Sequence, residues 1–184
     1  LVRLTFWQTI LSVAGIVVAV VALYAALTES AAVREQTAAS VWPYVQFSIS
    51  DHKSDAGANF SLALTNTGVG PARMQNLRLI LGGEAVHNWE QAVSLVNGNP
   101  NAVVARSFIT YRVISPGETV NVFSTTNPDL VGRFQRAMID PNSSIAYCYC
   151  SIFDACWLAD STAIIQQPTA IDTCPDFGEA AYRH

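Results

Sequence analysis

The stretch LTFWQTILSVAGIVVAVVALYAALT, residues 4–28, determines how the rest of the sequence is interpreted. Its 25 residues carry no charge, and as a helix rising 1.5 Å per residue it would be about 37 Å long. The hydrocarbon core of a bilayer is about 30 Å thick, so residues 1–28 are expected to form a transmembrane anchor. Two alternatives are a buried core helix, which is seldom so long and uncharged, and a cleaved signal peptide, whose apolar region would be shorter.

Two sets of residues in this stretch predict how the helix meets its surroundings. Trp7 and Tyr24 lie near its two ends, and amphipathic rings prefer the headgroup level of a membrane, so both are expected to be interface anchors. Small residues recur at alternating spacings of three and four, which places them on one helix face; they are Ser12, Gly15, Ala19, Ala22 and Ala26. Membrane helices associate by close backbone approach, so this face is expected to pack against a partner helix. The alternative is that alanine is simply common in membrane helices.

The anchor is followed by a helical stalk, expected over residues 29–41, that Pro43 ends. Alternating apolar residues and turn-forming residues then predict a mainly β domain over residues 42–165. Strands are expected at 45–50, 60–65, 74–81, 102–113 and 119–125, with a hairpin of 144–152 and 156–158 and short helices at 85–96 and 129–138. Many short strands with regular turns indicate an immunoglobulin-like β-sandwich. Residues 166–184 are expected to be an irregular tail that is tied back to this domain.

Four cysteines lie between residues 148 and 174, namely Cys148, Cys150, Cys156 and Cys174. An even number in an exported domain predicts two disulfides. Free buried thiols are one alternative and a metal site is another, although a zinc site usually shows two close cysteine pairs and only one is present. Because Cys148 and Cys150 face the same side of a strand, a bond between them would be strained. We therefore favour Cys150–Cys156 together with Cys148–Cys174.

Composition and motifs favour a binding role over catalysis. The chain has 184 residues, of which 51% are hydrophobic and 13% charged, and its net charge is −4. It therefore lacks the excess of positive charge that is typical of nucleic-acid-binding proteins. The sequence predicts no catalytic residues, no cofactor and no metal site, because no nucleophile or acid–base pair is indicated. The titratable residues considered were His52, His87, Glu90, Asp154, Asp160, Asp172, Asp176 and His184. His87 and Glu90 are three residues apart and are interpreted as part of a solvated helix face.

Three stretches carry a resemblance to known proteins: VWPYVQF at 41–47, LTNTGVGPARMQNLRL at 64–79 and IAYCYCSIFDACW at 145–157. Together they resemble uncharacterised small bacterial membrane proteins with one N-terminal helix, a Trp-Pro junction and an N-x-G-x-GPA connector. The resemblance implies the β-sandwich domain but no activity, and the cysteines depart from its common pattern. In the connector, Gly68 and Gly70 permit positive φ and Pro71 restricts Gly70, so two strands are expected to turn sharply or to cross between sheets there. The alternative is a phosphate-cradling loop, but the Lys-Ser/Thr pair and the following helix of such a loop are missing. SPGETVNVF at 115–123 is similar to immunoglobulin-like bacterial modules, where a Pro-Gly turn precedes a core strand.

The leading functional hypothesis is a non-catalytic accessory or assembly subunit of a larger membrane complex, such as an energy-converting or transport complex. Its partners would be other membrane subunits and the lipid bilayer, and a homo-oligomer is compatible with the same features. The anchor would lie in the cytoplasmic (inner) membrane as a single pass, with the domain on the periplasmic or extracellular side. One alternative is a pilin-like filament subunit. Many pilins carry an acidic residue at position 5, and Thr5 in this sequence argues against that alternative. The other is a membrane-anchored ligand-binding or sensor module, which would need a pocket.

Overall fold

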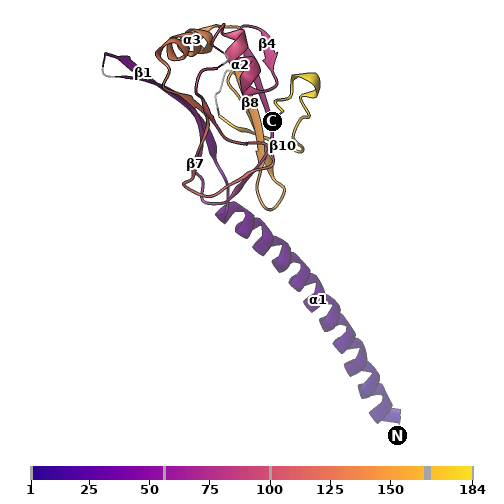
Figure 1. Ribbon diagram of the computed structural model, residues 1–184. Helices are drawn as coiled ribbons and strands as arrows, with labels where there is room; N and C mark the ends of the chain where they lie inside the picture. Colours follow the sequence, from indigo (N-terminus) through magenta and orange to yellow (C-terminus); the bar gives the residue numbers. More distant parts are fainter. Residues whose placement is uncertain (1, 56, 100, 164–166, 184) are drawn as a thin grey trace. The chain divides into compact units, whose positions relative to one another are not determined.

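A computed structural model describes residues 2–55, 57–99, 101–163 and 167–183 of the chain (Figure 1). The contacts within it define two compact units, Leu1–Ser40 and Val41–His184. The first unit is the helix α1 (Val2–Ser40), and the second is a β domain.

Helix α1 is continuous over 39 residues and ends at Ser40, shortly before Pro43, as expected from the sequence. Its side chains are exposed from Phe6 to Thr37, and from Phe6 to Leu27 apolar residues surround it on all sides instead of forming one stripe. A helix of this kind has no polar face to turn toward water. It is long and apolar enough to cross a membrane.

The β domain consists of two antiparallel sheets. One has the strand order β1-β2-β7-β5, formed by β1 (Val45–Ser54), β2 (Gly57–Asn66), β7 (Thr119–Thr125) and β5 (Ala105–Arg106). The other has the order β10-β9-β8-β3-β4, formed by β10 (Thr169–Ile171), β9 (Cys156–Asp160), β8 (Ser144–Cys150), β3 (Ala72–Leu81) and β4 (Glu84–Val86), and β6 (Val113–Ile114) also pairs with β3. The expected fold class, a mainly β sandwich on an N-terminal helix, is confirmed.

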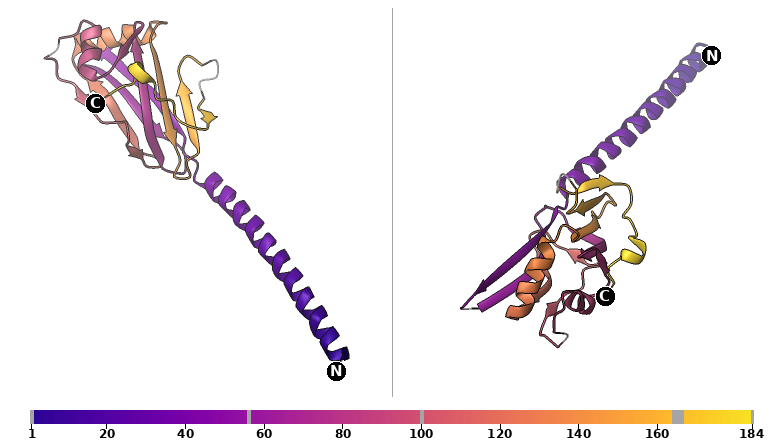
Figure 2. Two further views of the ribbon diagram at one scale, coloured as in Figure 1. Left: turned by 90° about the vertical axis from the view of Figure 1, so that its right-hand side faces the viewer. Right: turned by 90° about the horizontal axis from the view of Figure 1, so that it is seen from above.

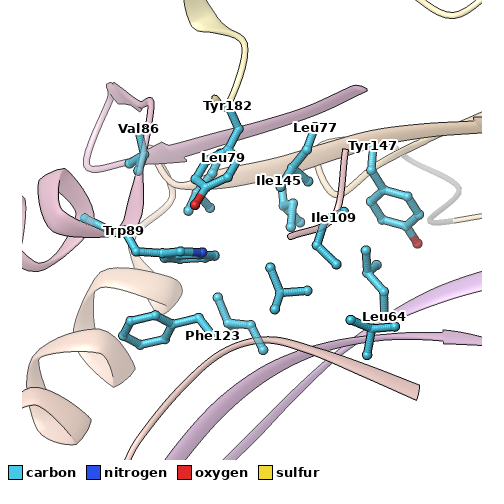
Figure 3. Close-up of a cluster of buried hydrophobic side chains, with 14 of the residues drawn as sticks. Leu64, Leu77, Leu79, Val86, Trp89, Ile109, Phe123, Ile145, Tyr147 and Tyr182 are labelled. Atoms are coloured by element: carbon cyan, nitrogen blue, oxygen red, sulfur yellow. The ribbon is translucent and has the colours of Figure 1, made fainter. Parts of the chain in front are cut away.

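Apolar side chains from both sheets meet in one core. In Figure 3, Leu77, Leu79 and Ile145 of the second sheet face Leu64 and Phe123 of the first. The short helices α2 (Trp89–Leu95) and α3 (Pro128–Ile139) cover the core and contribute aromatic rings to it. Both helices start at an asparagine whose side chain accepts backbone N–H groups, which satisfies donors that a helix start leaves unpaired.

The Gly-Gly pair after β3 forms a hairpin that sequence reasoning missed. Gly82 and Gly83 have φ values of 57° and 90°, and positive φ at both central positions is what a tight two-residue hairpin needs. The chain therefore folds straight back as β4, and α2 starts at Trp89 instead of residue 85.

The segment 102–113 was expected to be a strand, and this prediction was wrong. Only β5 and β6 are strands there, and they belong to different sheets. The segment therefore crosses between the sheets, and a continuous ladder is impossible along such a path. Buried Ile109 fixes it to the core, and Tyr111 takes a positive φ of 60° where the backbone turns.

The C-terminal segment was expected to be irregular, and this was wrong in part. Thr169–Ile171 pairs with β9 as strand β10, and Gly178–Ala180 forms one 3₁₀ turn. Tyr182 is only 5% exposed and packs on Trp89 with 5.4 Å between ring centroids. Its aromatic side chain makes the last residues part of the core, as Figure 3 shows.

Candidate functional site

The five small residues of α1 lie on one uninterrupted helix, as their spacing requires. Ser12 and Ala26 are 14 positions apart, so the stripe is about 21 Å long at 1.5 Å per residue. A Cβ added at Gly15 would meet no atom within 4 Å, so this position is open to a neighbour. Trp7 and Tyr24 are exposed near the two ends of the apolar stretch. The helix therefore presents one face on which only small side chains project.

The connector NTGVGPA holds the junction that follows α1. The Asn66 side chain is fully buried and donates to the carbonyls of Gly70, at 2.8 Å, and Ile114, at 3.0 Å. Its Oδ1 accepts from the backbone N–H of Tyr44 at 3.2 Å and of Gly68 at 3.1 Å. One side chain thus satisfies four backbone groups from three segments, and the connector and junction form a single structural unit.

The connector crosses from β2 of the first sheet to β3 of the second, which is one of the two paths expected from its glycines. Neither Gly68 nor Gly70 is in the positive-φ region. A Cβ on either would overlap the backbone of residues 41–44, so close approach is the reason for glycine here. The N–H groups of Val69 and Gly70 point at the Trp42 carbonyl, at 3.0 and 3.3 Å.

Aromatic packing completes the junction. The ring of Trp42 lies 5.1 Å from that of Tyr44 and 6.3 Å from that of Trp157 on β9. The hairpin of β8 and β9 therefore packs against the Trp-Pro junction through Trp157. The three stretches that carried the sequence resemblance are neighbours in space.

The four cysteines form two disulfides in the pairing that we favoured from the sequence. Cys148 is bonded to Cys174, and Cys150 is bonded to Cys156 across the β8–β9 hairpin. The first bond joins the C-terminal segment to the middle of a sheet. The sulfurs of Cys150, Cys156 and Cys174 lie within 4.8 Å of one another. Each of them is oxidised, and metal ions bind the thiolate form, so this state offers no metal-ligating thiolate there.

Most of the acidic residues considered above make ion pairs that support the sheets. Asp154 pairs with Arg73, and Asp160 pairs with Arg78 at 3.0 Å, so both tie β9 or its turn to β3. Glu90 pairs with Arg106.

The other titratable residues considered above are dispersed. His87 lies with Nδ1 3.3 Å from the Ala181 carbonyl, and His52 contacts the Ser54 hydroxyl. Asp172 and Asp176 are exposed near the C-terminus, and His184 lies outside the described residues.

The segment that crosses between the sheets exposes large apolar side chains, and it had been predicted to be a strand. We call residues 103–113 the apolar strap. Val103, Phe108, Tyr111 and Val113 on it are 86%, 72%, 82% and 52% exposed. A strand prediction would have placed half of these side chains inside. No signal in the sequence marked them as exposed, because their exposure follows from the crossing between sheets.

A cavity of about 440 Å³ lies beside the apolar strap. It is lined by Trp89, Tyr182 and Phe108, and the ion pair of Glu90 with Arg106 stands at the same place. The indole N–H of Trp89 is buried without a hydrogen-bond partner. Burial raises the pKa of Tyr182 well above the ordinary range of a phenol, so its hydroxyl stays protonated.

Residues 6–154 match the model of a family described as a domain of unknown function, DUF8453. The match covers more than half of the chain. The chain belongs to this family. No curated protein and no solved structure matches it.

The DUF8453 match includes most of the apolar helix and most of the β domain. It begins at Phe6, inside α1, and runs to the turn of the β8–β9 hairpin. Most of the apolar helix, the Asn66 connector and the apolar strap all lie within the matched range. Cys156 and Cys174 lie beyond the matched range.

Proposed function

We propose that this chain is a non-catalytic, membrane-anchored accessory subunit of a larger membrane protein complex, for example an energy-converting or transport complex. The observation that carries the proposal is the stretch 4–28 of α1, which has no charged residue on any side and has a continuous small-residue face. In lipid there is no hydrophobic drive between helices, so association depends on close backbone contact, which such a face allows.

The β domain offers a second contact surface for the same partners. Large exposed apolar residues on a monomer mark interaction sites, and interface cores are enriched in aromatic residues and poor in charge. The apolar strap contributes the exposed rings of Phe108 and Tyr111, and its two charged residues, Arg106 and Arg112, are paired with Glu90 and Glu118. The strap would cover or bridge the extramembrane part of the complex while α1 docks within the bilayer.

The disulfides support a domain on the periplasmic or extracellular side of the cytoplasmic membrane. Disulfides persist in oxidising compartments and are rare in the cytosol. Labelling intact cells with an impermeant maleimide tests the orientation. We expect no labelling before reduction and labelling of the four cysteines after treatment with an impermeant reductant. Labelling before reduction would contradict the disulfides, and labelling that appears only after the cells are lysed would contradict the orientation.

Native mass spectrometry after mild detergent extraction tests the subunit role. The proposal predicts one defined mass that exceeds the chain by at least one different protein. A ladder of multiples of the chain would favour a pilin-like filament subunit instead. A monomer without any partner would contradict both the subunit role and the filament role.

The cavity beside Trp89 favours one second candidate, a membrane-anchored ligand-binding module. The aromatic walls suit an apolar body, and Arg106 at the rim suits a carboxylate. Phenylacetate combines both groups and is a suitable probe. Under this alternative it should shift the indole N–H resonance of Trp89, assigned with Trp89→Phe, and Arg106→Gln should abolish the shift. An unmoved resonance would remove the alternative for ligands of this class.

A further inference from the structure

Strand β1 has one edge that no strand of the described structure covers. It pairs with β2 over its whole length, from Val45 to Ser54, and with no other described strand. Every residue from Ser48 to Ser54 is exposed. Figures 1 and 2 show β1 and β2 extending together beyond the rest of the domain, with α3 beside them. Exposed edges of this length are templates for pairing with another chain.

The hydrogen-bonding groups on this edge can be assigned from one contact. The Val45 carbonyl accepts from the Tyr147 hydroxyl of the opposite sheet at 3.0 Å, so it faces away from β2. The pairing of β1 with β2 has no register shift, so the direction alternates regularly along the strand. Ile49, Asp51 and Lys53 therefore direct their backbone N–H and C=O groups to the open edge.

The start of the edge is closed and the remainder is open. Burial raises the pKa of Tyr147 above its ordinary range, so its hydroxyl remains a donor to Val45. The edge beyond Phe47 has no such cover within the described residues. An added strand is thus restricted to the outer half of β1.

We propose that this outer half pairs antiparallel with the same edge of a second copy, with Asp51 opposite Lys53 of the second copy. In this register each Asp51 faces a lysine, and each lysine faces an aspartate, so opposite charges are directly across from each other. The register shifted by two residues would place Asp51 opposite Asp51, which is unfavourable. Asp51 and Lys53 lie on the face of β1 beside Arg136, which adds positive charge next to the incoming aspartate.

The pairing overlaps only about five residues per copy, which is small compared with the surface of a stable soluble dimer. Two copies anchored in one membrane meet at a much higher effective concentration than free domains do, so a short edge suffices. The pairing rests on the proposed membrane anchoring but not on the proposed subunit role, because its contacts are made by β1 and by neither α1 nor the apolar strap. A complex with two copies and a simple homodimer would both show it.

Cysteine cross-linking of the full chain in phosphatidylcholine vesicles tests the register. In the proposed pairing His52 lies opposite His52 of the second copy, with Cα atoms about 4.5 Å apart, which suits a disulfide. His52→Cys should therefore give a covalent dimer under mild oxidation. Ser50→Cys is the matched control, because it lies on the same exposed face but its counterpart is displaced by four residues, about 13 Å. The native cysteines are bonded and do not react.

The dimer yield of His52→Cys should exceed that of Ser50→Cys several-fold. Equal yields would indicate random collision and would overturn the proposal, as would no cross-link in either variant. A higher yield for Ser50→Cys would also contradict it, because that result requires a different register.

Charge reversal provides the second arm, in the His52→Cys background. Asp51→Lys or Lys53→Asp alone should lower the yield, and the two changes together should restore it. Glu84→Lys makes the same charge change as Asp51→Lys on distant strand β4 and should leave the yield unchanged. Failure of the double reversal to restore cross-linking would overturn the ion-pair assignment and with it the proposed register.

Discussion

At the residue scale, Asn66 shows how one buried polar side chain can organise three segments. Its sequence motif indicated glycines that permit positive φ, but it did not reveal the close approach of residues 41–44 that requires them. A turn with positive φ and a close approach of two backbones both select glycine, and only the second depends on residues from elsewhere in the chain. The distinction between them therefore could not be made from the local sequence.

Replacing Asn66 by alanine should lower the free energy of unfolding by about 3 kcal/mol, because several buried backbone groups would lose their partner. Chemical denaturation of the full chain in detergent measures this. Asn121→Ala, at an exposed position of β7, is the matched control and should change stability by less than about 0.5 kcal/mol. Equal effects of the two variants would mean that the four hydrogen bonds of Asn66 contribute nothing specific.

Two neighbouring tyrosines of β8 should respond differently to loss of the hydroxyl. Tyr147 donates to the Val45 carbonyl, so Tyr147→Phe should cost about 1 kcal/mol at neutral pH. The Tyr149 hydroxyl is buried with no hydrogen bond of good geometry, so Tyr149→Phe should be neutral or stabilising. The opposite ranking in thermal or chemical unfolding would contradict the assignment of the hydrogen bond.

The same pair predicts sensitivity to alkali. Burial raises the pKa of Tyr149 to about 12 and that of Tyr147 further. A raised folded pKa contributes stability below the unfolded pKa of about 10, and this contribution is lost as pH rises above it, because only the unfolded state can ionise readily. Stability should therefore fall between pH 10 and 12, and less steeply in Tyr149→Phe. An unchanged slope in that variant would show that Tyr149 is not a source of the effect.

At the element scale, strands with clean alternation were predictable and the crossing segment was not. Residues 119–125 form β7 with the expected bounds, and exposed and buried positions alternate along it except at Val122 and Phe123, which are both buried where the pairing with β2 shifts register. Residues 102–113 have the same residue types, but their path between the sheets allows only two short pairings. Strand propensity reports how well a residue suits a pleated surface, and it contains no information about which sheet is available.

The two disulfides should differ in what they stabilise. Cys148–Cys174 closes a separation of 26 residues, and Cys150–Cys156 closes one of 6. Loop-closure entropy then predicts that the double alanine variant of the first pair loses about 1 kcal/mol more than that of the second. Only the first should expose the C-terminal segment to proteolysis, measured by limited digestion. Equal protection in both variants would show that Tyr182 and β10 hold this segment without the bond.

At the scale of the whole molecule, the sequence predicted the mainly β class and the long apolar helix because both depend on patterns within a segment. The Asn66 connector, the apolar strap and the open edge of β1 were not predictable, since each depends on which segments become neighbours. The residues expected to pack against a partner lie on one face of α1, but a partner helix itself is a proposal. The proposed subunit role therefore depends on whether the small-residue face of α1 contacts another protein.

A pull-down from membranes with two matched double variants is the most direct test of that face. Gly15→Leu with Ala19→Leu places bulk on the small-residue face, and Val17→Leu with Val20→Leu changes positions elsewhere on the helix at equal or greater hydrophobicity. The β domain should keep its fold and its disulfides in both, because it has its own core. The account predicts that the first variant loses its partner proteins while the second keeps them, because only small side chains allow the backbones to approach. Equal retention of partners by both variants would contradict docking through this helix face.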